Sequence, residues 1–473
     1  MSGTPIPDNT ARFSADELLA ATSARGAFDA EVRGVSVDSR RVRPGELFVA
    51  LRGETHDGHD HARAAAEAGA AALLVERPVE APGAAVLEVP DTLAALGALA
   101  ALHRRRFAIP CVGITGSVGK TTTKELVGAA LRAIGHSPLV TRGNLNNRIG
   151  VPMTLLALEP SHTAAVIEMG MNEPGEIADL AAMAAPTIGI VTAVAEVHTE
   201  GVGSIEGVAR EKGALLLALG PEGVAVYNGD DAPLAPYAER SAAGVKLSFG
   251  RAEGASARLV AHAVDQAGTS ATISLDGRTI EVRLALLGAH AALDAAAALA
   301  AVVALEPARL DDAARGLADA APAPHRMSPV RAGELLVIDD AYNASPRSMA
   351  AALSACAELA RGRGGRLVAV LGDMLELGTR EVALHREVGR EVVRAGAHAF
   401  VACGERMTEA GRAALEAAGE GRGPRPKIVF VRDVDAAAGC VRDLAGPRDV
   451  VLVKGSRGMR MERVVAALEG EGV

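Results

Sequence analysis

The stretch Gly113–Leu126, GITGSVGKTTTKEL, decides how the rest of the sequence is interpreted. It fails the strict phosphate-loop pattern G-x-x-x-x-G-K-[ST], because Ile114 stands where the first glycine belongs. Gly116 and Gly119 still bracket a tight turn between the apolar run CVGIT and an amphipathic segment that begins near Lys120. Backbone N–H groups of such a turn can hold phosphate oxygens, helped by the positive end of the helix that follows. The stretch therefore predicts a nucleotide site, against the alternative of an ordinary glycine-rich turn.

Two side chains of this turn have a chemical role in that prediction. Lys120 would reach the β- and γ-phosphates, and the hydroxyl of Thr121 would be a ligand of Mg²⁺. The contacts to ATP are expected from the whole turn, which consists of Thr115, Gly116, Ser117, Val118, Gly119, Lys120, Thr121 and Thr122.

Composition limits the class of protein. A chain of 473 residues suggests about three domains, and 49% hydrophobic with 23% charged residues suits a folded α/β protein. A net charge of -9 and the absence of Trp weigh against nucleic-acid binding, which favours basic surfaces and stacking platforms. The four cysteines are far apart, as expected of free thiols in a reducing compartment. The polar N-terminus lacks the pattern of a signal peptide, and no run is apolar and long enough for a membrane span, so we expect a cytoplasmic protein.

Apolar runs that alternate with helical patterns predict three α/β domains. Residues 1–107 form a small N-terminal α/β domain, and residues 108–320 form a central phosphate-loop domain with a mostly parallel sheet. The proline-interrupted segment ADAAPAPHRM marks a linker. Residues 321–473 then repeat the strand-helix alternation and predict a Rossmann-like, doubly wound C-terminal domain.

The displaced glycine indicates a family. The loop TGSVGKT resembles that of the Mur ligases, and so do further stretches along nearly the whole chain: TRGNLNNRIGVPMTLL, AVIEMGMNEPGEI, VHTEGVGSIEGVAREKG, LLGAH, IDDAYNASPRSM, LGDMLELG and LVKGSRG. The resemblance implies an ATP-dependent amide ligase of cell-wall precursor synthesis. ATP would phosphorylate a carboxylate, and an amine would displace the phosphate. GNLNNRIGVP and DDAYNASP resemble the branch that adds D-alanyl-D-alanine to UDP-N-acetylmuramoyl-tripeptide.

The resemblance also implies what each domain binds. The N-terminal domain would hold the UDP end of the substrate, with Ser39 and Arg40 as contacts, and the C-terminal domain would hold the incoming dipeptide and part of ATP. The partners would be these small molecules, with no nucleic acid, and the protein would be a monomer. Three alternatives remain: a sister ligase that adds a single amino acid, a phosphate-loop NTPase without ligase activity, and a non-catalytic nucleotide-sugar binding protein.

Three residues are candidates for the reaction centre beside Lys120. Glu168 ends the strand pattern AAVIE, where open α/β sheets bind ligands, and the resemblance makes it a ligand of Mg²⁺; capping a neighbouring helix is the alternative. The resemblance makes His198 a ligand of a second metal ion. It also implies that CO2 carbamylates Lys212, although from its pattern alone Lys212 would be a solvated helix lysine.

Further binding residues come mainly from the resemblance. Asn146 and Asn147 would bind substrate or orient the γ-phosphate, with turn formation as the alternative, and Thr141 is a weaker candidate. The ATP contacts from later in the chain would be His290, Asp294, Arg326, Asp340 and Asn343. Lys454 or Arg457 could pair with the carboxylate of the dipeptide.

The segment 288–294 departs from the family pattern G-x-H-N-x-x-N, whose amides help to bind adenine. His290 is present, but Ala291 and Asp294 replace the two asparagines. A carboxylate can accept a hydrogen bond from the adenine amino group but cannot donate one to a ring nitrogen.

Histidines cluster in the N-terminal domain, where His56, His59 and His61 lie within six residues. Their spacing fits no common zinc pattern. Asp60, before a helical segment, is equally well explained as an N-cap.

Overall fold

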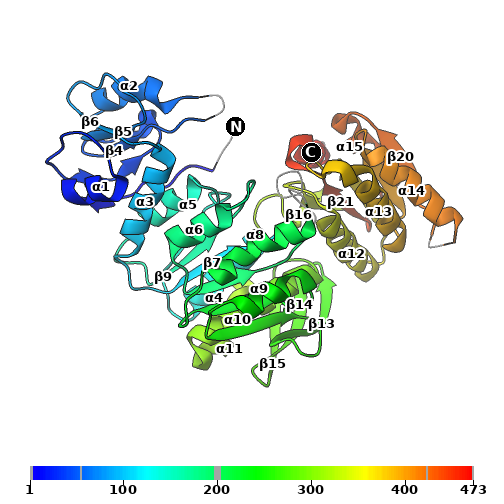
Figure 1. The fold of residues 1–473 in the computed structure, drawn as a ribbon. Helices are drawn as coiled ribbons and strands as arrows, with labels where there is room; N and C mark the ends of the chain where they lie inside the picture. The colour runs from blue at the N-terminus through cyan, green and yellow to red at the C-terminus, as the bar shows by residue number, and fades with distance from the viewer. Residues whose placement is uncertain (1–3, 54–55, 196–203, 422–423, 471–473) are drawn as a thin grey trace.

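The computed structural model describes residues 4–53, 56–195, 204–421 and 424–470. Three α/β units follow one another along the chain, and each is built on its own largely parallel sheet (Figure 1). The N-terminal unit (blue) and the C-terminal unit (yellow to red) lie on opposite sides of the central unit in this view. The expected fold class is confirmed.

The N-terminal unit has a four-stranded parallel sheet in the order β3-β4-β5-β6, beside a two-stranded antiparallel pair, β1-β2. Helix α3 packs against helices α5 and α6 of the central unit, and a continuous hydrophobic core crosses this boundary. The elements are β1 (Arg12–Phe13), α1 (Ala15–Thr22), β2 (Val32–Arg33), β3 (Val35–Ser36), β4 (Leu47–Val49), α2 (Ala62–Glu67), β5 (Ala72–Val75), β6 (Ala85–Glu88) and α3 (Thr92–Arg104).

The central unit has a nine-stranded sheet in the order β15-β14-β13-β12-β11-β10-β7-β9-β8. Strands β7 to β12 are parallel, so their carboxyl ends meet at one edge. The strands are β7 (Cys111–Thr115), β8 (Pro138–Val140), β9 (Ala164–Glu168), β10 (Ile188–Val191), β11 (Val224–Asn228), β12 (Val245–Gly250), β13 (Ala257–Asp265), β14 (Gly268–Leu275) and β15 (Arg278–Leu284). The helices are α4 (Lys120–Ala133), α5 (Gly150–Leu156), α6 (Glu176–Ala184), α8 (Ile205–Leu217), α9 (Ala235–Arg240), α10 (Ala289–Leu305) and α11 (Leu310–Gly316).

Strands β13, β14 and β15 form an antiparallel ribbon that the strand-helix alternation did not predict. Asp276 and Gly277 join β14 to β15 with positive φ angles of 52° and 70°. Asp-Gly between two alternating runs is a strong hairpin signal, so the sequence did contain the information for this turn.

The C-terminal unit has a six-stranded sheet in the order β16-β17-β21-β18-β19-β20, in which only the β16-β17 pair is antiparallel among the described strands. Its strands are β16 (Ser328–Ala332), β17 (Leu335–Asp340), β18 (Leu367–Gly372), β19 (Ala399–Cys403), β20 (Lys427–Val431) and β21 (Val450–Lys454). Its helices are α12 (Pro346–Gly362), α13 (Glu381–Arg394), α14 (Met407–Gly419), α15 (Ala437–Leu444) and α16 (Glu462–Glu469). In the ranges described above, no helix is long and apolar enough to cross a membrane.

Candidate active site

The predicted phosphate loop connects β7 to α4, as the sequence indicated. Gly116 must be glycine because a Cβ there would lie 1.9 Å from the Thr192 hydroxyl oxygen. Gly119 caps α4 with a left-handed φ of 84°, a conformation that favours glycine. The first N–H groups of α4 have no partners within the helix and form a potential anion site together with its dipole.

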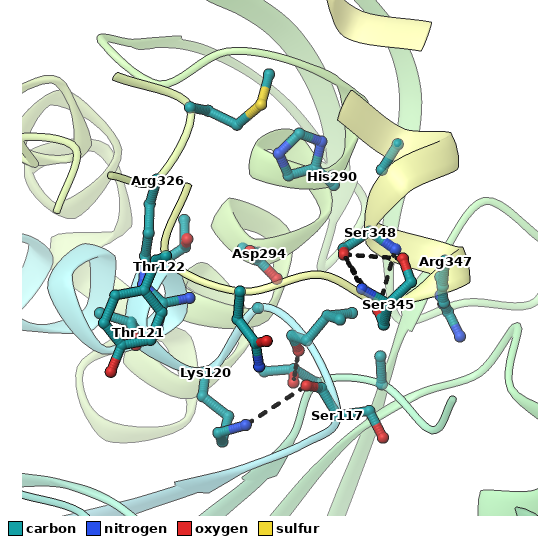
Figure 2. A pocket seen from close by; sticks show the side chains of 18 of the residues that line it. Ser117, Lys120, Thr121, Thr122, His290, Asp294, Arg326, Ser345, Arg347 and Ser348 are labelled. Atoms are coloured by element: carbon teal, nitrogen blue, oxygen red, sulfur yellow. Dashed lines mark hydrogen bonds between the residues drawn. The ribbon is translucent and has the colours of Figure 1, made fainter. Parts of the chain in front are cut away.

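One cavity of about 520 Å³ opens beside this loop. Side chains from both the central and the C-terminal units surround it (Figure 2). The predicted site residues that line it are Ser117, Val118, Gly119, Lys120, Thr121, Thr122, Asn146, Asn147, Glu168, Lys212, His290, Asp294, Arg326, Asp340, Asn343 and Lys454.

The cationic side of the cavity combines Lys120 with Arg326. The Lys120 ammonium group donates to the carbonyl of Gly116 at 2.7 Å, within its own loop. Burial lowers the pKa of Lys120 to about 8, the charge of Glu168 opposes this shift, and Arg326 adds to it. The Arg326 guanidinium stacks 4.1 Å above the ring of Tyr342. Two cations from different units therefore face one space, as binding of a polyphosphate would require.

Glu168 offers a ligand for a divalent cation. Its Oε1 atom accepts a hydrogen bond from Asn146 Nδ2 at 2.8 Å, whereas its Oε2 atom is buried without a hydrogen-bond partner among the described residues. Thr121 lines the same cavity. Such oxygen atoms suit Mg²⁺, which is usually held by one or two protein groups together with phosphate and water. Asn147 Oδ1 accepts hydrogen bonds from the N–H groups of Ile149 and Gly150, at 3.1 and 2.8 Å, which is the turn formation considered as its alternative.

Lys212 is buried on α8, not solvated as its pattern alone suggested. Burial holds its pKa well below the usual range, with a further contribution from the positive charge of Lys120, against the effect of Glu211. A neutral amine is a nucleophile, whereas an ammonium group is not. His198 lies outside the described residues.

The segment that departs from the family pattern forms the N-cap and most of the first two turns of α10, which begins at Ala289. Asp294 lies between Lys120 and His290 in Figure 2. Burial raises the pKa of the Asp294 carboxyl to about 8, and its Oδ2 atom has no hydrogen-bond partner within the described chain. Burial lowers the pKa of His290.

The C-terminal unit contributes an ion pair to the cavity. Lys454 Nζ donates to Asp340 Oδ2 at 2.5 Å and to the carbonyl of Asn343 at 2.9 Å. The second Asp340 oxygen accepts from the N–H of Met327 at 3.1 Å. Lys454, expected to bind the carboxylate of the acceptor, is therefore the partner of Asp340. Arg457 is more exposed, and its guanidinium lies 6.0 Å from the centre of the Tyr342 ring.

Several predicted residues lie away from the described cavity lining. The Thr115 hydroxyl donates to the carbonyl of Met169, at the base of the loop near Gly116. Ser39 and Arg40 lie in a short helical turn of the N-terminal unit, where Arg40 is exposed and pairs with Asp38.

The histidine cluster of the N-terminal unit has a structural explanation. His59 is buried; its Nδ1 lies 2.6 Å from Asp57 Oδ1, and its Nε2 accepts from the N–H of Glu76. Asp57 caps this turn, in place of the expected Asp60. No group of three or more His, Cys, Asp or Glu residues in the described ranges could hold a metal ion.

Two residues near the cavity were not identified from the sequence. Arg347, on α12, donates to Asp231 Oδ1 at 2.6 Å and to the carbonyl of Val194 at 3.1 Å, and so joins the C-terminal unit to the central unit. Lys124 is buried beside Glu168. Its position one helical turn after Lys120 was the available signal, because residues four apart share a helix face.

Comparison with known proteins identifies the family. The Mur ligase middle domain matches residues 114–302, the Mur ligase glutamate ligase domain matches residues 325–457, and the domain described as Mur ligase family, catalytic domain, matches residues 31–104. The chain belongs to the Mur ligase family, which confirms the resemblance seen in the sequence.

The similar proteins narrow the branch. UDP-N-acetylmuramoyl-tripeptide–D-alanyl-D-alanine ligase of Escherichia coli is 37% identical over 94% of this chain and 95% of that protein. MurF from Acinetobacter baumannii has a TM-score of 0.88 at 30% identity, over 99% of this chain and 100% of the other. MurF from Thermotoga maritima in complex with ADP has a TM-score of 0.82 at 28% identity, over 92% of this chain and 97% of the other.

Proposed function

We propose that the protein is the ATP-dependent ligase that adds D-alanyl-D-alanine to UDP-N-acetylmuramoyl-tripeptide. The observation that carries the proposal is a shared cavity in which Lys120 and Glu168 of the central unit meet Arg326 and Asp340 of the C-terminal unit. The E. coli relative bears the name of this activity, and the T. maritima relative was solved with ADP. A phosphate-loop NTPase without ligase activity would leave the contribution of the C-terminal unit without a role.

The reaction would occur in two steps. A carboxylate oxygen of the tripeptide forms a bond to the γ-phosphorus of ATP while the bond to the β-phosphate oxygen breaks, and ADP is released. The amine of the dipeptide then forms a C–N bond with the acyl carbon, loses a proton and displaces phosphate. Both steps bring anions together, so catalysis would rest mainly on positioning and charge neutralisation.

The residues that line the cavity would have different roles in this reaction. Lys120 and Arg326 would neutralise the phosphate oxygens, and the N–H groups at the start of α4 would hold them. Thr121 and Glu168 would hold Mg²⁺, which supplies charge neutralisation at the transferred phosphoryl group. His290 and Asp294 would face the nucleotide from α10. Asp340, already paired with Lys454, would accept hydrogen bonds from the ribose.

We also propose that Lys212 is carbamylated. Burial favours the neutral form of its amine, which would attack CO2 to form an N–C bond with loss of a proton, and the resulting anion would help to hold a second metal ion with His198. Lys212→Ala should lose activity and regain part of it with added acetate, and carbon-13 bicarbonate should give a carbamate resonance only in the unsubstituted protein. If both observations failed, Lys212 would not be carbamylated.

Phosphate release tests the main proposal. The protein is supplied with ATP, Mg²⁺ and UDP-N-acetylmuramoyl-tripeptide, and D-alanyl-D-alanine, D-glutamate or a diamino acid is added in turn. We expect release that depends on the dipeptide. Release with a single amino acid would indicate a sister ligase, and release indifferent to every acceptor would exclude ligase activity.

We further propose that the protein acts as a monomer in the cytoplasm. The described units supply the cavity lining from one chain. Light scattering during size-exclusion chromatography would test the monomer, and fractionation of the source cells would test the location.

A further inference from the structure

Lys124 is a buried cation that the reaction above does not use. It lies on α4, and its side chain is only 1% exposed. Lysine is rarely buried to this extent unless it is paired, because removing an ammonium group from water costs free energy. This position therefore requires an explanation from its surroundings.

Three oxygen atoms surround the Lys124 ammonium group. It donates to the carbonyl of Thr141 at 2.8 Å, lies 2.9 Å from Glu125 Oε1, and lies 3.8 Å from Glu168 Oε2. The last distance is too long for a hydrogen bond. Lys124 thus offsets the buried charge of Glu168 without occupying the Oε2 atom, which has no other hydrogen-bond partner in the described structure.

Thr141 extends this contact to the backbone of Glu168. The Thr141 hydroxyl accepts from the N–H of Glu168 at 3.0 Å, and the Thr141 N–H donates to the carbonyl of Val166 at 3.0 Å. Lys124 therefore connects α4 to Thr141, which is itself hydrogen-bonded to strand β9.

The segment that follows Thr141 makes a second contact with Glu168. Asn146 Nδ2 donates to Glu168 Oε1, and the Asn146 carbonyl accepts from the N–H of Gly170 at 2.7 Å. The segment 141–146 thus contacts both the backbone N–H and the side-chain carboxylate of Glu168. Lys124 anchors the start of this segment to the helix that also carries Lys120 and Thr121.

We propose that Lys124 is a positioning residue that holds Glu168 and the segment 141–146 in register with the phosphate loop. This inference rests on the proposed role of Glu168 as a ligand of Mg²⁺. It adds that the orientation of Glu168 is maintained from α4 by a residue that need not touch the nucleotide. Groups that orient a metal ligand usually change metal affinity or activity when they are replaced.

Metal affinity tests the proposal, because loss of positioning and loss of charge would change the affinity in opposite directions. Mn²⁺ serves as the probe, titrated in the presence of ADP and followed by electron paramagnetic resonance. Lys124→Met removes the donor and the charge while keeping most of the volume, and we expect Mn²⁺ to bind about tenfold more weakly. On charge alone, loss of a cation next to the site would tighten binding. Unchanged or tighter binding would overturn the proposal.

Further variants separate positioning from general damage. Lys124→Arg keeps a charged donor and should restore the affinity to within about threefold of the original; an Arg variant as impaired as the Met variant would contradict the proposal. Lys427→Met, at an exposed lysine of β20, is the matched control and should bind Mn²⁺ normally. If Lys124→Met does not fold, Lys124→Gln replaces it with the same expected direction.

The same titration distinguishes this inference from the proposed function. Glu168→Gln should abolish most of the Mn²⁺ affinity. If it binds Mn²⁺ normally, the role of Glu168 in the proposed function is wrong, and the present inference fails with it. If Glu168→Gln loses the ion while Lys124→Met retains it, only the inference about Lys124 fails.

Discussion

The carboxylate of Asp294 lies against the α-carbon of Gly119, so that a Cβ built on this glycine would meet Asp294 Oδ1 at 2.6 Å. The residue that replaces a family asparagine thus packs on the phosphate loop itself. The loop conformation and the second turn of α10 constrain each other, and substitutions at either residue should affect the nucleotide site.

Gly119→Ala should impair both folding and nucleotide binding. The alanine must adopt a left-handed φ and also displace Asp294. We expect the free energy of unfolding to fall by about 1–2 kcal/mol from the backbone strain alone, and ADP to bind at least about tenfold more weakly. Denaturant unfolding and calorimetric titration with ADP would measure the two effects.

Gly175 offers a matched control. It has a similar φ of 90° and also precedes a helix, but a Cβ there would meet no atom within 4 Å. Gly175→Ala should show the backbone cost with normal ADP binding. Equal ADP affinities for the two variants would contradict the proposed packing constraint.

Asp294 should make stability depend on pH. Burial raises the pKa of its carboxyl to about 8 in the folded protein, whereas the pKa of the same carboxyl in the unfolded chain is about 4. The stability that the protonated carboxyl contributes to the folded state is therefore fully present below about pH 4 and is lost as the pH rises through about 8. Asp294→Asn should be more stable than the unsubstituted protein at about pH 9, by a margin that shrinks toward about pH 5 with a slope of at most about 1.4 kcal/mol per pH unit.

Thermal unfolding over this pH range would test the effect. Asp311→Asn, at an exposed aspartate of α11, is the control and should follow the unsubstituted protein. A difference between Asp294→Asn and the unsubstituted protein that stays constant with pH would show that Asp294 is already ionised in the folded state.

The sequence predicted the parts of the site that depend on local pattern. The strand before Gly116 and the helix from Lys120 follow from apolar runs and glycine positions, and parallel strands bring Glu168 to the same sheet edge as the loop. The Asp-Gly signal for the β14-β15 turn was also present in the sequence.

Contacts between distant residues were not predictable in the same way. The spacing of Lys124 from Lys120 indicates a shared helix face, but lysines usually keep their ammonium groups in water, so this spacing does not indicate that Lys124 is buried. The pairing of Lys454 with Asp340 depends on the neighbouring strands β17 and β21, which are more than a hundred residues apart in the chain. The link from Arg347 to Asp231 depends on how two units dock.

Tyr342 should act through its ring rather than its hydroxyl. Its ring supports the guanidinium of Arg326, and such stacking contributes about 1 kcal/mol. We expect Tyr342→Ala to raise the KM for ATP about three- to tenfold, while Tyr342→Phe stays within about twofold. Steady-state kinetics would measure both, and a Phe variant as impaired as the Ala variant would indicate that the hydroxyl is the important group.

Arg347 should couple the C-terminal unit to the central unit. Its guanidinium reaches Asp231, and the second oxygen of Asp231 accepts from the N–H of Val194 at 2.9 Å. We expect Arg347→Met and Asp231→Asn each to raise the KM for ATP about fivefold, because the two units together line the cavity. The double variant should have a KM little higher than that of either single variant, with a coupling energy on the order of 1 kcal/mol.

Arg278→Met, which removes an exposed ion pair to Asp311 within the central unit, is the control and should leave the KM unchanged. If the effects of Arg347→Met and Asp231→Asn on the KM simply multiply in the double variant, the two residues act independently. Their ion pair then does not hold the two units together around the cavity.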